Sequence, residues 1–174
     1  RALDTYRKGY DVNPKSDLLK DKVWENTIRM GHLSYQKGNL KEAYPWYKKA
    51  FEFDSDRPET YLFLGQTAIL AGDEQTALLA YSRFTGFRPD SWLGYANIAD
   101  IISKDKNQRD KALHLAMGAI SLSGDRWEPR DTLGWIYLCR GDIPEAKKQF
   151  QWIANAHKAN WTILTKGNYL KALK

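Results

Sequence analysis

The sequence predicts an all-α fold built from a short repeat, and three observations support this expectation. Small residues recur with a period of thirty-four residues, so that Gly65 and Ala77 have counterparts at Gly31 and Ala43. Glycine followed by a short polar residue, as at Gly72, is typical of a helix stop followed by a helix start. No segment has the alternating apolar pattern that is typical of a strand. We therefore expect an array of short helices.

The same series continues in the second half of the chain with one extra residue. Gly65 corresponds to Ala99 after thirty-four residues and to Gly134 after thirty-five more. Ala77 corresponds to Ala112 after thirty-five residues, so this series contains the same extra residue. The insertion therefore lies between Ala99 and Ala112, in the polar run 104–108, and an insertion in a turn is what a repeat array tolerates best.

These repeats resemble the tetratricopeptide repeat (TPR), whose units are pairs of antiparallel helices with small and aromatic residues at set positions. The resemblance implies a right-handed superhelical solenoid within a single domain of residues 1–174. The second full repeat matches nearly every signature position, and the third matches most loosely. The predicted divisions are a half repeat, four repeats and a capping helix: 1–14, 24–57, 58–91, 92–126, 127–160 and 161–174.

Small residues recur in the repeat because two helices must approach closely at these positions. A bulky side chain at Gly65 would have to displace a helix, at about 1 to 3 kcal/mol or more. We expect the alanine of each second helix to pack against the small residue of the first. The structural positions are Gly31, Ala43, Gly65, Ala77, Ala99, Ala112, Gly134 and Ala146.

Length and composition fit one domain with a continuous core. The chain has 174 residues, 43% of them apolar, and seven tryptophans. No stretch approaches the roughly eighteen apolar residues of a membrane span. The single cysteine, Cys139, excludes an internal disulfide. Because the sequence begins at Arg1 within the repeat pattern, we expect a fragment of a longer protein and leave the compartment, cytoplasmic or periplasmic, undecided.

In the TPR family the first helices of the units line a concave groove, and the resemblance carries this groove over to specific positions here. The groove has an apolar middle and polar flanks, and an exposed apolar patch marks a partner site. Chaperone-tail docking is not expected, because Leu62 and Asp100 stand at two of the places where that subset of the family grips a carboxylate. The candidate ligand-binding residues are Arg29, His32, Tyr35, Leu62, Phe63, Gln66, Ile69, Asn97, Asp100, Asp131 and Trp135.

Nothing in the sequence indicates catalysis, a metal or a cofactor. The three histidines, His32, His114 and His157, are far apart and lack the spacing that places two ligands on one helical face. Cys139 has no histidine in register, and no glycine-rich phosphate loop follows a strand. We therefore expect no enzyme, no cofactor and no metal site.

The first functional hypothesis is a protein-interaction scaffold that holds a partner peptide or helix in the concave groove. The alternative is a polysaccharide-binding module of a bacterial export or secretion assembly, with tryptophans and tyrosines that could stack on sugars. The isoelectric point near 9.3 raises nucleic acid as a third ligand class. Carboxylates at the groove positions, such as Glu59 and Asp131, would repel phosphates and argue against it.

Overall fold

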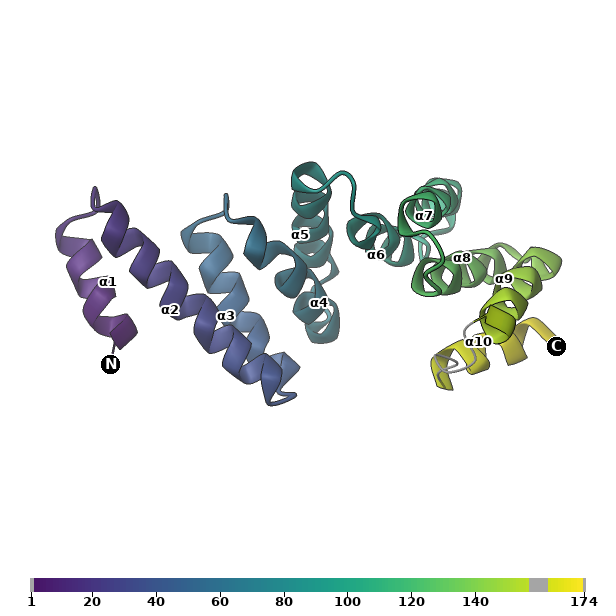
Figure 1. The fold of residues 1–174 in the computed structure, drawn as a ribbon, viewed down its shortest axis with the longest axis horizontal. Coiled ribbons are helices and arrows are strands. Elements are labelled where there is room, and N and C mark those ends of the chain that lie inside the picture. The colour runs from purple at the N-terminus through teal and green to yellow at the C-terminus, as the bar shows by residue number, and fades with distance from the viewer. Residues whose placement is uncertain (1, 157–162, 174) are drawn as a thin grey trace. The chain divides into compact units, whose positions relative to one another are not determined.

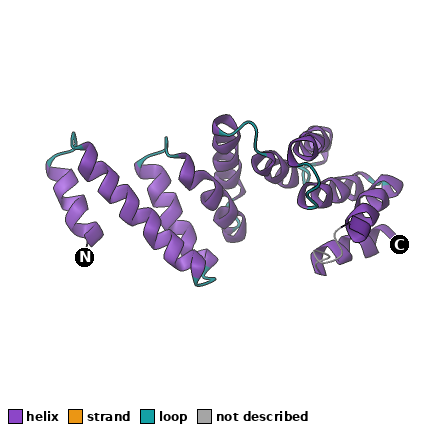
Figure 2. Cartoon of the chain, viewed as in Figure 1, coloured by secondary structure: helices purple, strands orange, loops and turns teal. Residues whose placement is uncertain are grey.

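The computed structural model describes residues 2–156 and 163–173, and these residues contain helices and no strand (Figure 2). This confirms the all-α solenoid class predicted from the sequence. The α-helices are α1 (Ala2–Val12), α2 (Asp17–Gln36), α3 (Leu40–Phe53), α4 (Tyr61–Ala71), α5 (Glu74–Phe87), α6 (Trp92–Ile102), α7 (Arg109–Ser123), α8 (Glu128–Arg140), α9 (Ile143–Ala156) and α10 (Ile163–Leu173). Two short 3-10 helices, η1 (Pro58–Thr60) and η2 (Lys106–Gln108), precede α4 and α7.

The chain divides into two compact units, residues 1–84 and residues 85–174, and α5 crosses the boundary between them. In the first unit α2 packs against both α1 and α3, and α3 packs against α4 (Figure 1). In the second unit α6 pairs with α7 and α8 pairs with α9, while α10 packs on α9 and α8. The repeat boundaries and the single-domain organisation stay predictions. Residues 1, 157–162 and 174 of the predicted terminal segments lie outside the described residues.

Helix α2 is longer than the first helices of the following pairs. It has 20 residues, whereas α4 and α6 have 11 each. The hydroxyl of Ser16 caps it by accepting a hydrogen bond from the N–H of Leu19 at 3.3 Å. The sequence predicts this extension, because the segment before Trp24 continues in helical pattern. Its added turns provide the surface on which α1 packs.

An aromatic ring packs against each of the three glycines that the first helices contribute to the close contact, Gly31, Gly65 and Gly134. A Cβ at Gly65 would lie 2.6 Å from the ring of Tyr81, and a Cβ at Gly134 would lie 2.7 Å from that of Phe150. Gly31 faces the ring of Tyr47 in the same way, at 2.9 Å. The alanines that the sequence places in this contact are buried, but the atoms nearest to the glycines belong to the rings.

The third pair replaces this combination of glycine and ring with two alanines. Ala99 takes the place of the glycine, and Ala116 takes the place of the aromatic residue. Both side chains are fully buried. At these two positions the third pair thus has two small side chains and no aromatic ring.

The turn between α4 and α5 shows how the pairs are joined. Gly72 has a φ of 81°, and the N–H of Asp73 bonds to the carbonyl of Ala68 at 2.9 Å, which closes α4. The carboxylate of Asp73 then accepts a hydrogen bond from the N–H of Thr76 at 3.0 Å. The Tyr44 hydroxyl and the Thr76 N–H hold the pKa of Asp73 far below its usual value.

The corresponding turn before α3 corrects a prediction. In the sequence, Asn39 followed three residues later by Glu42 predicts a capping pair for the helix that begins here. The side chain of Asn39 makes no capping hydrogen bond to the helix backbone. Its amide Nδ2 instead donates to the Glu42 carboxylate at 3.1 Å. The backbone of Asn39, with ψ of 63°, is not in the extended conformation that turns a side chain toward the helix N–H groups.

Candidate functional site

The predicted groove residues of the first unit lie on α2 and α4 and largely contact one another. The ring of Phe63 is at the centre of an aromatic cluster that we define as His32, Tyr35, Tyr47 and Phe63. Its centroid lies 4.8 Å from that of His32 and 5.4 Å from that of Tyr35, both edge to face. It also stacks on Tyr47 at 5.4 Å. Such pairs stabilise the fold beyond the area that they bury.

Polar atoms of this cluster are also paired within the unit. The Tyr35 hydroxyl donates to the Gln66 side-chain oxygen at 3.2 Å, and the Tyr47 hydroxyl lies 2.9 Å from Nδ1 of His32. Burial lowers the pKa of His32 and raises the pKa of Tyr47, so both groups are neutral at pH 7. Four of the predicted groove residues therefore stabilise the first unit through contacts with its own side chains.

The remaining predicted residues of the first unit lie outside this cluster. Arg29 is exposed, and its guanidinium donates to the side-chain oxygen of Asn26 at 3.0 Å. Leu62 and Ile69 are half-buried on α4. The structure therefore does not gather the predicted residues of the first unit around one cavity.

The second unit has two adjoining cavities on the face formed by α6, α8 and α10. The first has a volume of about 300 Å³ and the second of about 200 Å³, and Asp100, Asp131 and Thr132 line both. We call this surface the inner groove. Its lining residues are Trp92, Leu93, Ala96, Asn97, Asp100, Trp127, Glu128, Asp131, Thr132, Trp135, Asn168 and Lys171.

All four predicted site residues of the second unit line the inner groove. Asn97 and Asp100 come from α6, and Asp131 and Trp135 come from α8. Two residues of a third helix, Asn168 and Lys171, were missed. The sequence predicts that residues 161–174 form a capping helix or the first helix of another repeat, and no groove positions are assigned to them.

Local hydrogen bonds hold several lining side chains in place. The amide Nδ2 of Asn97 donates to the Leu93 carbonyl at 2.7 Å, which leaves its side-chain oxygen available as an acceptor. The side chain of Asn168 is buried, and the ammonium of Lys171 lies 5.2 Å from the ring centroid of Trp135. The groove thus combines fixed polar groups with a flat indole surface, as peptide and small-molecule sites do.

The charge of the inner groove is negative, although the whole chain carries a net charge of +6. Asp100, Glu128 and Asp131 contribute carboxylates, and Lys171 is the one cation among the lining residues that the structure describes. Arg126 lies just outside, with a guanidinium nitrogen 3.9 Å from Oε1 of Glu128. No group of three acidic, histidine or cysteine side chains in the described ranges could hold a metal ion.

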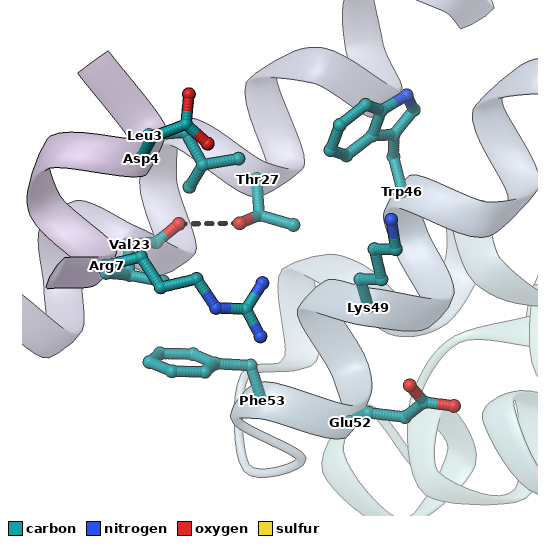
Figure 3. A pocket seen from close by; sticks show the side chains of 9 residues that line it. All are labelled: Leu3, Asp4, Arg7, Val23, Thr27, Trp46, Lys49, Glu52 and Phe53. Carbon is teal, nitrogen blue, oxygen red and sulfur yellow. Dashed lines mark hydrogen bonds between the residues drawn. The ribbon is translucent and has the colours of Figure 1, made fainter. Parts of the chain in front are cut away.

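A further cavity of about 370 Å³ lies in the first unit between α1, α2 and α3, and the sequence does not predict it. Leu3, Asp4 and Arg7 come from α1, Val23 and Thr27 from α2, and Trp46, Lys49, Glu52 and Phe53 from α3 (Figure 3). The Thr27 hydroxyl is already used, because it donates to the Val23 carbonyl at 2.7 Å. Two acids and two bases line this cavity, so it does not discriminate by charge.

Neither the cysteine nor the described histidines form catalytic arrangements. Burial raises the pKa of the half-buried Cys139 thiol, which disfavours the reactive thiolate. His32 bonds to Tyr47, and the exposed His114 bonds through Nδ1 to the Asp110 carbonyl at 2.7 Å. The third histidine, His157, lies outside the described residues.

A family model described as Tetratricopeptide repeat matches residues 28–57, which hold the end of α2 and all of α3. These residues therefore match one tetratricopeptide repeat, which agrees with the resemblance seen in the sequence. No curated protein matches the sequence significantly. Among the described residues, no helix is long and apolar enough to cross a membrane.

Solved structures with this fold include several TPR proteins. The MamA protein is 20% identical, with a TM-score of 0.66 over 86% of each chain. A thermophilic TPR protein of Thermus thermophilus is 16% identical, with a TM-score of 0.69 over 86% of this chain and 80% of that one. YrrB, a TPR protein with an unusual peptide-binding site, is 20% identical, with a TM-score of 0.60 over 99% of this chain and 89% of its own. At these identities the likeness establishes the fold, and the fold supports a protein-interaction scaffold.

Proposed function

We propose that this TPR protein is a non-catalytic scaffold that binds an extended segment of a partner protein in the inner groove of its second unit. The observation that carries the proposal is the pair of adjoining cavities on α6, α8 and α10. Together they have a volume of about 500 Å³, from 300 and 200 Å³, which is within the range of ligand sites. YrrB, similar in fold, has a peptide-binding site, which supports this class of ligand.

The lining residues suit an extended peptide. The side-chain oxygen of Asn97 can accept a hydrogen bond from a peptide N–H, and the indole of Trp135 offers a flat apolar surface. The Thr132 hydroxyl donates to the Glu128 carbonyl at 3.4 Å and can still accept a hydrogen bond. The first unit contributes less to binding, because its aromatic cluster is already paired internally. The polysaccharide alternative has no support from the similar structures.

A random dodecapeptide library displayed on phage tests the proposal. The library is selected on the immobilised protein, and enriched clones are compared on the Asn97→Ala, Trp135→Ala double variant. Trp46→Ala is the matched control, because it removes an indole from α3 in the other unit. We expect binding to fall about tenfold or more on the groove variant, or about 1.4 kcal/mol, and to persist on the control. Enriched clones that bind both variants as well as the parent would contradict the proposal.

A further inference from the structure

We propose, on the basis of the function proposed above, that the inner groove selects segments rich in lysine and arginine. Three carboxylates line it against one ammonium group. This negative charge is opposite in sign to that of the whole chain, so it does not follow from the average composition. A cationic segment is complementary to the groove, whereas an acidic one would meet like charges.

Helix stability accounts for two of the three carboxylates but not for the third. Glu128 and Asp131 are in the first turn of α8, where the helix dipole favours negative charge. Asp100, in contrast, is in the last turn of α6, which ends at Ile102. The helix dipole disfavours a carboxylate there. Asp100 lines both cavities of the groove, so its carboxylate adds to the negative charge there.

One carboxylate oxygen of the groove needs a hydrogen-bond donor. Oε2 of Glu128 is buried and has no hydrogen-bond partner among the described residues. The nearby Arg126 is 3.9 Å from the other oxygen, which is too long for a hydrogen bond. A buried acceptor without a donor is costly, and a ligand ammonium or guanidinium group would satisfy it.

The indoles at the two ends of the groove already bind cationic side chains of the protein. The guanidinium of Arg126 lies 5.8 Å from the ring centroid of Trp92, and the ammonium of Lys171 lies 5.2 Å from that of Trp135. Cations favour these positions because the face of an indole carries partial negative charge. Lysine and arginine side chains of a ligand could bind in the same way to the indole faces and carboxylates that line the groove.

The sequences enriched from the phage library provide the first test. We expect groove-dependent clones to carry an excess of lysine and arginine. Groove-dependent clones that are neutral or acidic would overturn the charge preference and leave the peptide scaffold intact. A library that yields no groove-dependent clone would overturn both proposals, so the two failures are distinguishable.

The second test removes carboxylates from the groove and, in a separate experiment, cationic side chains from the peptide. An enriched peptide, fluorescently labelled, is titrated with the parent and with the Asp100→Asn, Asp131→Asn variant. The matched control is Asp11→Asn, Asp125→Asn, which removes two exposed carboxylates outside the groove. We expect about a tenfold loss of affinity for the groove variant and less than about a twofold change for the control.

Changing the peptide keeps the test valid if the double variant does not fold. The same peptide with glutamine at every lysine and arginine should lose about tenfold or more in affinity for the unaltered protein. Raising NaCl from about 0.05 to about 0.5 M should weaken binding of the original peptide only, since salt screens exposed charges. Equal affinity of the two peptides would overturn the inference.

Discussion

The inner faces of the two units use the same repeat positions in opposite ways. In the first unit, Phe63 contacts the rings of His32, Tyr35 and Tyr47, and His32 also contacts Tyr47. In the second unit, Asp100 and Asp131 line both cavities of the inner groove. A position that faces the groove of a TPR array can thus either stabilise the fold or remain available to a partner. The neighbouring side chains decide between the two.

The largest expected difference between the units is in stability. Phe63→Ala removes the central ring of the aromatic cluster and should lower the free energy of unfolding by about 2 to 3 kcal/mol, somewhat below the value for a fully buried phenylalanine. Trp135→Ala lines a cavity and should cost only about 1 kcal/mol. Urea denaturation followed by circular dichroism measures both. An equal or larger loss for Trp135→Ala would remove the contrast between the units.

The contacts between glycines and aromatic rings should be equally sensitive to substitution in both units, so the units do not differ in this respect. Gly65→Ala and Gly134→Ala place a Cβ at 2.6 and 2.7 Å from buried rings. Overpacking should outweigh the gain in helix propensity, for a net loss of about 1 to 2 kcal/mol in each case.

Gly118→Ala is the matched control for these substitutions. Gly118 is in α7, and a Cβ there would have nothing within 4 Å. The control should therefore be neutral or gain up to about 1 kcal/mol. Thermal melting of the three variants decides the matter, and a stabilised Gly65→Ala would show that the ring of Tyr81 can move aside.

The aromatic cluster should make the first unit sensitive to mild acid. Because burial lowers the pKa of His32, the unfolded chain binds a proton at His32 more readily than the folded chain does. The associated stability is complete above the ordinary histidine pKa near 6.5 and is lost as the pH falls below it.

Denaturation at pH 7.5 and pH 5.5 measures this effect against the His32→Asn variant. The parent should lose more stability between the two pH values than the variant, because the variant has no imidazole to protonate. Identical pH dependence in the two proteins would count against a buried neutral imidazole in the cluster.

The smallest expected effect concerns the cation of the inner groove itself. Lys171→Gln removes the ammonium that lies over Trp135 and competes with a cationic ligand for that indole. Affinity for an enriched lysine- and arginine-rich peptide should rise about threefold, and the free energy of unfolding should change little. Weaker binding by this variant would indicate that Lys171 contacts the ligand favourably.

Much of the fold could be predicted from sequence because its signals are local. The spacing of small and aromatic residues specifies where helices pair, and it identified Gly31, Gly65 and Gly134 as positions of close approach before the rings of Tyr47, Tyr81 and Phe150 were seen above them. The prediction that the Asn39 side chain caps α3 was wrong, because a cap depends on backbone conformation as well as on residue type. The residue type of Asn39 fits a cap, but its backbone conformation does not.

By itself, the sequence determined the helical class and the period, since these depend on spacing along one chain. Its resemblance to the TPR family implied the positions that could face a groove. Only the tertiary structure decided which of those positions pack into the aromatic cluster and which line a groove. Phe63 packs against rings from α2 and α3. Asp100 and Asp131 instead line a groove to which α10 adds Asn168 and Lys171. The physical reason is that neighbours on other helices determine whether a side chain is packed or lines a groove, and those neighbours are far away in sequence.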